Sequence, residues 1–198
     1  MIVLGITGGT GCGKTTLLRR VEARGGTVID CDAVYHKLLI SDRALLSAID
    51  ARFPGVVTDG VLDRKKLGKV VFEDAAALGD LNGLTHPAVD ARVQQLLTAA
   101  RQEGRTLAAI DAIALVESGL SRLCDATIAV TAPAEDRVKR LMAREGISEE
   151  YARLRIAAQK SDEEFSARCS RTICNDYPTA EGFSEACDRL LDQIIGGN

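Results

Sequence analysis

The chain has 198 residues, a formal net charge of −3 and a hydrophobic content of 46%. This length suits one domain with room for an inserted subdomain, and the apolar fraction is enough for a sizeable core. The acidic balance argues against a protein that coats nucleic acid, and no apolar stretch approaches the roughly 20 residues that span a membrane. The six cysteines contain no C-x-x-C pair, which indicates buried thiols in a reducing cytoplasm rather than disulfides or a zinc site.

A glycine-rich stretch follows the first apolar run of the chain, residues 2–6. Residues 8–16 read Gly-Gly-Thr-Gly-Cys-Gly-Lys-Thr-Thr and complete the G-x-x-x-x-G-K-S/T pattern of a phosphate-binding loop between an expected strand and an expected helix. Lys14 is expected to bridge the outer phosphates, and the Thr15 hydroxyl to coordinate Mg²⁺. The alternative is a glycine-rich turn with a chance lysine. The pattern predicts that a nucleoside triphosphate is bound by Gly9, Thr10, Gly11, Cys12, Gly13, Lys14, Thr15 and Thr16.

Two acids follow the next strand. Residues 14–24 predict a helix that two glycines end, and residues 27–31 predict a short strand buried on both faces. Asp30 and Asp32 fall at its carboxyl end, where ligands sit in open parallel sheets. Asp32 is expected to accept the proton of an acceptor hydroxyl, or to orient that hydroxyl; the alternative is that it caps the next helix. Asp30 is expected to have a supporting or Mg²⁺-linked role.

A helical pattern without a strong strand occupies residues 33–103. That length far exceeds the usual connection between sheet strands, so it predicts an inserted helical subdomain. An insertion beside a phosphate site is a natural place to hold a second substrate. Asp42, Asp63 and Asp74 are the expected helix caps, and Pro87 is expected at a first helical position. The expected helices cover residues 43–50, 64–67, 75–84 and 87–101, after a first one over 33–39.

Three further strands are expected over residues 106–110, 126–130 and 171–175, before an amphipathic terminal helix over 181–195. Asp111 ends the first of these strands and resembles a Walker B acid that holds Mg²⁺; the alternative is an ordinary acid at a strand end. The whole chain, residues 1–198, is therefore expected to form a single α/β domain. Its expected architecture is the three-layer P-loop NTPase fold with a parallel five-stranded sheet.

Clustered arginines mark a predicted lid over residues 137–160. Pro133 opens its first helix and Ser148 caps its second. A lid would close over the triphosphate and place guanidinium groups on the transferring phosphoryl group. We expect this of Arg140 and of Arg144. The alternative is a solvated helical face laced with salt bridges.

A phosphate loop serves motors, switches and kinases alike. The short length, the inserted helical module and the arginine-bearing segment favour a small-molecule kinase that uses ATP and Mg²⁺. The Asn/Thr-Lys-x-Asp motif that a GTPase switch would need for guanine does not occur. Another small-molecule or nucleoside monophosphate kinase and a non-catalytic ATP-binding switch remain as alternatives. No required protein partner is evident.

Residues 7–16 and then 28–32 resemble the paired signatures of the dephospho-CoA kinase family, which usually read T-G-G-I-G-S-G-K-S and V-I-D-A-D. Further matches follow in the same order at residues 59–67, 84–87 and 115–117, then at Arg140, Arg144 and Gln159. The resemblance implies ATP-dependent phosphorylation of the ribose 3′-hydroxyl of dephospho-CoA. It also implies that the helical insert holds the CoA portion and that Asp32 is the general base. It favours a substrate contact for His86, which could otherwise be a cap or packing residue. For Tyr35 and His36, a substrate contact and a structural role both remain open.

The chain departs from the family pattern at two places. Residues 111–115 read Asp-Ala-Ile-Ala-Leu where the family usually has an apolar residue followed by Pro-Leu-Leu, which puts the local metal arrangement in doubt. Cys12 replaces a common serine. A thiol near helix N–H groups can have a lowered pKa, which predicts sensitivity to oxidants or alkylators. A tolerated serine substitute is the alternative.

Overall fold

The computed structural model describes residues 1–197 of the chain. Its contacts divide it into two compact units. The first combines Met1–Ile29 with the chain from Ala100 onward, and the second is Asp30–Ala99. The second unit covers most of the segment that was expected to be an insertion. No helix of the described residues is long and apolar enough to cross a membrane.

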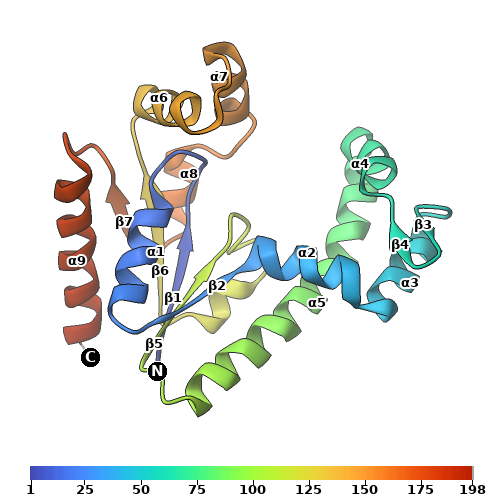
Figure 1. Cartoon of the computed structure of the whole chain (residues 1–198), viewed down its shortest axis with the longest axis horizontal. Coiled ribbons are helices and arrows are strands. Elements are labelled where there is room, and N and C mark those ends of the chain that lie inside the picture. Colours follow the sequence, from blue (N-terminus) through green and yellow to red (C-terminus); the bar gives the residue numbers. More distant parts are fainter. Residues whose placement is uncertain (198) are drawn as a thin grey trace. The chain divides into compact units, whose positions relative to one another are not determined.

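The first unit is built on a five-stranded sheet with the strand order β2-β5-β1-β6-β7 (Figure 1). β1 lies at its centre and pairs in parallel with β5 and β6, and β6 pairs in parallel with β7. The predicted parallel five-stranded sheet is therefore confirmed. The strands are β1 (Ile2–Thr7), β2 (Thr27–Asp30), β5 (Leu107–Asp111), β6 (Ala126–Thr131) and β7 (Arg171–Cys174).

Helices surround this sheet. The predicted cap at Ser148 is confirmed, because the Ser148 hydroxyl accepts the Tyr151 N–H at the start of α7. The predicted helix start after Pro133 is confirmed too, because Pro133 directly precedes α6. Two helical elements were missed, the short 3₁₀-helix η1 and the α-helix α8, which begins with a capping box between Ser161 and Glu164. The helices are α1 (Lys14–Ala23), η1 (Leu120–Leu123), α6 (Ala134–Glu145), α7 (Glu149–Ala157), α8 (Asp162–Ala167) and α9 (Ala180–Gly196).

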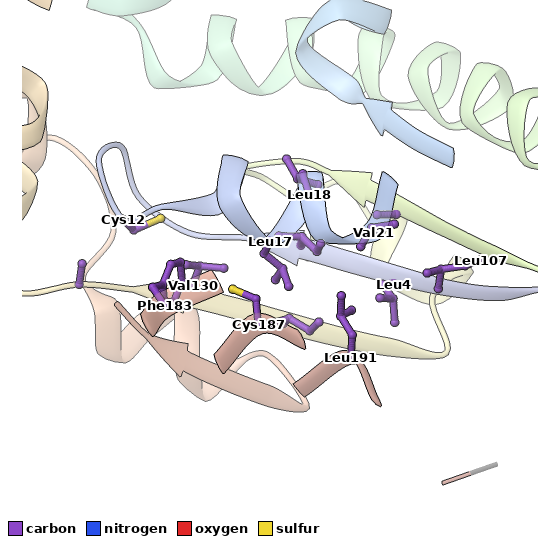
Figure 2. Packing of buried hydrophobic residues seen from close by; sticks show 14 residues of the cluster. Leu4, Cys12, Leu17, Leu18, Val21, Leu107, Val130, Phe183, Cys187 and Leu191 are labelled. Carbon is purple, nitrogen blue, oxygen red and sulfur yellow. The ribbon is translucent and has the colours of Figure 1, made fainter. Parts of the chain in front are cut away.

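Two faces of the sheet are covered. On one face, Leu17 and Val21 of α1 pack with Cys187 and Leu191 of α9 around Leu4 of β1 (Figure 2). Side chains alternate along a strand, so Gly5 faces the other side. There a Cβ at Gly5 would lie 2.7 Å from Leu115 and 2.8 Å from the Cys124 sulfur, in the connection between β5 and β6. The apolar runs of the central strands are therefore buried on both faces, as parallel sheets require.

The second unit has its own core, which buries Leu39 of α2, Ile49 of α3 and Val71 of α4, among others. It contains a short antiparallel hairpin, although the sequence showed only a helical pattern without a strong strand here. The turn residues Asp59 and Gly60 have φ angles of +52° and +76°, which suit a tight reversal. The elements are α2 (Cys31–Ser41), α3 (Arg43–Arg52), β3 (Val57–Thr58), β4 (Val61–Leu62), α4 (Arg64–Glu73) and α5 (Ala75–Gln102).

Aspartates start the helices of this unit. Asp42, Asp63 and Asp74 accept backbone N–H groups two or three residues ahead, as predicted. The alternative role considered for Asp32 was wrong, because Asp30 is the cap of α2 and accepts the Ala33 N–H at 3.0 Å. Asp32 lies in the first turn of the helix, where its charge suits the helix dipole.

Two predicted helix extents were also wrong. The helix expected over 64–67 continues to Glu73 as α4. The helices expected over 75–84 and 87–101 form the single 28-residue α5, with Pro87 inside it. Proline lacks an N–H and therefore removes one helical hydrogen bond. Leu81 and Val89, on either side of Pro87, are both buried, and the Thr85 hydroxyl adds a bond to Leu81 O at 2.9 Å. Packing on both sides of Pro87 thus outweighs the local cost.

Candidate functional site

The loop between β1 and α1 has a backbone that only glycine adopts readily. Gly8, Gly11 and Gly13 have φ angles of +142°, +78° and +106°. A Cβ at Gly8 would also lie 2.1 Å from the Val130 carbonyl oxygen of β6. Gly13 precedes α1 directly, and no side chain of the described residues caps this helix. The loop therefore presents backbone N–H groups at a helix N-terminus, which is the form of an anion-binding site.

Lys14 and Asp111 lie together beside this loop. The Lys14 ammonium donates to Gly8 O at 3.1 Å and lies 3.8 Å from Asp111 Oδ1. The register of the sheet explains the second contact, because Asp111 pairs with Ile6 at the end of β1. Lys14 and Asp111, predicted separately as a phosphate contact and a metal ligand, thus share one edge of the sheet.

The donors near the loop fit Mg²⁺. Thr15 offers a hydroxyl and Asp111 a carboxylate, and both are oxygen ligands of the kind that Mg²⁺ prefers. Within residues 1–197, no group of three or more His, Cys, Asp or Glu side chains could form a protein cage for a metal. This arrangement suits a cation held by one or two protein oxygens together with substrate phosphates.

The structure separates the two arginines expected to act on the phosphoryl group. Arg140 of α6 donates to Gly11 O and to Asn175 O, each at 3.2 Å, so its guanidinium lies at the loop. Arg144 is exposed and pairs with the neighbouring Glu145 at 2.5 Å. In the same predicted lid segment, the Tyr151 side chain of α7 is also exposed, at 54%. Of the predicted arginine pair, only Arg140 has a hydrogen bond to the loop among the described contacts.

For three side chains, the sequence did not predict a contact with the loop. Arg137, Gln159 and Asn175 all bond to the loop backbone, and Arg137 is only 4% exposed. Arg137 was counted among the lid arginines, Gln159 only among the family matches, and Asn175 as part of a strand and turn. One signal was available, since Arg137 lies four residues before the buried Leu141 and so falls on the apolar face of α6. A charged residue on such a face needs buried partners.

Cys12 does not behave as expected. Its side chain is 1% exposed and belongs to the core shared by α1 and α9. Figure 2 shows it at the loop end of that cluster. Burial raises the pKa of the Cys12 thiol above its usual value, and the charge of Lys14 only partly opposes this. The expected low thiol pKa was therefore wrong, and the burial of the thiol argues against the sensitivity that was derived from it.

The remaining candidates lie in the second unit. Asp32 and His36 are exposed on α2, and the rings of Tyr35 and His36 have centroids 5.8 Å apart. Burial raises the pKa of the half-buried Tyr35 hydroxyl. His86 is partly buried inside α5 and does not start a helix. A cavity of this unit is lined by His36, Leu39, Ile40, Gly60, Val61, Leu62 and Arg64.

Comparisons with known proteins agree on one family. The family model described as dephospho-CoA kinase matches residues 2–181. A dephospho-CoA kinase of Deinococcus radiodurans is 40% identical over 191 residues, which is 96% of this chain and 92% of that protein. The solved dephospho-CoA kinase of Campylobacter jejuni is 27% identical with a TM-score of 0.70, over 99% of this chain and 98% of the other. A shikimate kinase of Acinetobacter baumannii, 14% identical with a TM-score of 0.54 over 100% of this chain and 95% of the other, shares the fold.

Proposed function

This chain belongs to the dephospho-CoA kinase family, an ATP-dependent kinase family, and we propose that it phosphorylates the ribose 3′-hydroxyl of dephospho-CoA. The products are coenzyme A and ADP. The observation that carries the proposal is the pairing of a complete phosphate loop with Lys14 and Asp111 at one sheet edge, within the matched residues 2–181.

The predicted site residues have different roles in the proposed reaction. The ribose 3′-oxygen attacks the γ-phosphorus of ATP, and the bond from that phosphorus to the β,γ-bridging oxygen breaks, so that ADP leaves. Asp32 receives the proton of the attacking hydroxyl. Lys14 and the loop N–H groups bind the phosphate oxygens, and Arg140 stabilises the charge that grows on them. Arg144 is a second candidate contact to the nucleotide, although it pairs with Glu145 in the present conformation.

Thr15 and Asp111 are the side chains that would hold Mg²⁺, with Asp30 as a further candidate. Asp30 combines that role with the cap of α2, where one of its oxygens already accepts the Ala33 N–H. Bound Mg²⁺ supplies positive charge that neutralises the phosphate oxygens during transfer. Lys14, 3.8 Å from Asp111, keeps a second positive charge in the same place.

The second unit is the proposed binding place of the CoA portion. Tyr35, His36 and His86 are the candidate contacts, and the first two lie together on α2. For the location of the protein we propose the cytoplasm, because none of the six cysteines, all within the described residues, forms a disulfide, as expected in a reducing compartment.

One assay tests the proposal against its rivals. The purified protein is incubated with ATP and Mg²⁺ in separate reactions that contain dephospho-CoA, AMP, CMP or shikimate. The products are identified by mass spectrometry. We expect one added phosphate on dephospho-CoA alone. Phosphate on another acceptor instead would assign the chain to a different small-molecule kinase activity. ATP binding without turnover on any acceptor would indicate a non-catalytic switch.

Two substitutions test the residue roles. Lys14→Ala and Asp32→Asn should each lower kcat about a hundredfold or more, because the first removes charge from the phosphates and the second removes the proton acceptor. Asp80→Asn is the matched control in the second unit, since Asp80 forms a surface ion pair with Arg52 and should leave kcat unchanged. An Asp32→Asn enzyme of nearly normal kcat would remove Asp32 from the base role.

A further inference from the structure

Three side chains hold the carbonyl oxygens of three consecutive loop residues. Arg137 Nε donates to Thr10 O at 2.9 Å. Arg140 Nη1 donates to Gly11 O at 3.2 Å, and Asn175 Nδ2 donates to Cys12 O at 3.0 Å. These three donors come from α6 and from the residue that follows β7. We call them the carbonyl brace of the loop.

The carbonyl brace controls where the loop N–H groups point. In a trans peptide the carbonyl oxygen and the next N–H lie in one plane and point in opposite directions, and the described chain has no cis peptide. Holding the oxygens of residues 10, 11 and 12 therefore turns the N–H groups of residues 11, 12 and 13 to the other side of the loop. Of these three N–H groups, that of Cys12 is engaged within the loop, in a long contact of 3.4 Å with Gly9 O. Successive N–H groups that share one side form the concave anion site known as a nest.

The brace is itself fixed. Arg137 is 4% exposed and donates to Asp162 Oδ1 and to Gln159 Oε1, each at 3.1 Å. The same Gln159 oxygen accepts the Thr10 N–H at 2.7 Å, so the Thr10 residue is held at both its N–H and its carbonyl. Asn175 is 7% exposed, and its backbone N–H continues the bonding to β6 at Thr131 O, 2.8 Å away.

The loop fits closely against these side chains. A Cβ at Gly9 would lie 2.2 Å from Arg137 Nη2, and one at Gly13 would lie 2.4 Å from Asn175 Nδ2. A Cβ at Gly11 would lie 3.0 Å from the Arg137 carbonyl oxygen. The glycines therefore serve the approach of the brace as well as the turn of the backbone, and the loop has little room to move away from it.

We propose that Arg137 and Asn175 are positioning residues for ATP, acting through the loop peptides and without touching the nucleotide. They hold the Gly11 and Gly13 N–H groups in the orientation that receives phosphate oxygens. The identity of the nucleotide, ATP, rests on the proposed function. Preorganised N–H groups need no rotation when the phosphates arrive, and binding is correspondingly tighter.

The test uses two conservative variants that remove hydrogen-bond donors. Asn175→Asp replaces the amide donor with an oxygen that repels Cys12 O, and Arg137→Lys keeps the charge but loses the fork that reaches three acceptors. The matched controls are Asn82→Asp on α5 and Arg189→Lys on α9, whose arginine pairs with Glu185 at the surface.

The readout is the Kd of ATP, measured by titration calorimetry without an acceptor, together with Tm and the two KM values. Each brace variant should bind ATP about tenfold or more weakly, with KM for ATP raised in parallel and KM for dephospho-CoA within about twofold. Both controls should match the wild type. Folded brace variants that bind ATP as tightly as the wild type would overturn the proposal.

A third variant covers the case in which a brace variant does not fold. Asp162→Asn leaves the loop and the brace in place but weakens the anchor of Arg137, and it should weaken ATP binding about threefold in the same direction. Unchanged binding in this variant would then overturn the proposal. Because the calorimetric titration contains no acceptor, its outcome is separate from the proposed function: a wild type that binds ATP but leaves dephospho-CoA unphosphorylated contradicts only the latter.

Discussion

At the scale of single residues, burial decides which thiols can react. The thiolate is the nucleophile, and apolar surroundings disfavour it. Cys12 shows this most clearly, because the positive charge of Lys14 and the nearby helix N-terminus do not overcome the burial that raises its pKa. Burial likewise raises the pKa of Cys124 and of Cys187 to about 12. Cys174, by contrast, is exposed at the end of β7.

The expected result is an ordered alkylation. With iodoacetamide at pH 8, Cys174 should be modified first, while Cys12, Cys124 and Cys187 remain unmodified in the folded protein. Peptide mass spectrometry at successive times measures the order, and the unfolded protein in guanidinium serves as the control in which all six cysteines react. Early modification of Cys12, prevented by ATP, would contradict the burial that the structure assigns to it.

The site residues also differ in how much of their role and contacts could be predicted from the sequence. Lys14 and Thr15 are defined by a local pattern, so the loop could be located from the sequence alone. The contact between Lys14 and Asp111 depends only on two strand ends meeting at one edge, and it follows from the predicted sheet. Arg137 and Asn175 depend on the packing of α6 and β7 against the loop. No spacing within the sequence encodes that packing.

At the scale of elements, helix starts were better predicted than helix continuity. Asp42, Asp63 and Ser148 are caps because a side chain meets a backbone group two or three residues away, which is a local event. Pro87 gave the signal of a helix start, yet proline is also compatible with a helix interior when packing on both sides compensates the lost bond. The hairpin β3–β4 was too short to give an alternating pattern.

Alanine substitutions in α5 should therefore stabilise the protein. Gly83→Ala should gain about 1 kcal/mol, since its Cβ meets nothing within 4 Å in a regular helix. Pro87→Ala should gain up to about 3 kcal/mol because it restores an N–H and removes the ring. A gain of about 1 kcal/mol corresponds to roughly 2–4 °C in Tm for a chain of this size.

Gly104→Ala is the matched control for these substitutions. Its Cβ also meets nothing within 4 Å, but its φ of +76° strains any other residue, so Tm should fall. Thermal unfolding followed by circular dichroism measures all three variants. A lower Tm for Pro87→Ala would show that the packing of α5 depends on the proline itself.

At the scale of the whole molecule, an ionic cluster joins the first and last helices of the sheet unit. Asp188 of α9 bonds to Arg20 of α1 at 2.8 Å and also pairs with Arg24. Arg24 reaches Asp192 as well, at 2.8 Å. The hydrogen bonds from Arg20 and Arg24 hold the pKa of Asp188 below its usual value. Helices from opposite ends of the sequence are thereby fixed to each other over a shared apolar core.

This cluster predicts a pH dependence of stability. A carboxyl whose pKa is lower in the folded state stabilises the fold above its unfolded pKa, about 3.9, and loses that contribution as the pH falls through the folded pKa. Asp188→Asn should lower Tm by about 3 °C between pH 5 and 7, and the difference from the wild type should vanish at the acid end. Asp192→Asn, at a more exposed position, is the control and should change Tm less. A difference that stayed constant down to pH 2 would exclude this origin.

The exposed Tyr151 on α7 has a spectroscopic consequence. The chain contains no tryptophan and three tyrosines: Tyr35 on α2, Tyr151 on α7, and Tyr177, whose ring centroid lies 6.0 Å from that of Phe183 on α9. A Tyr151→Trp variant would therefore carry the single indole fluorophore of the chain, which long-wavelength excitation selects over the two remaining tyrosines. Its emission wavelength would report the hydration of α7 alone as nucleotide is added, in real time and without an attached dye.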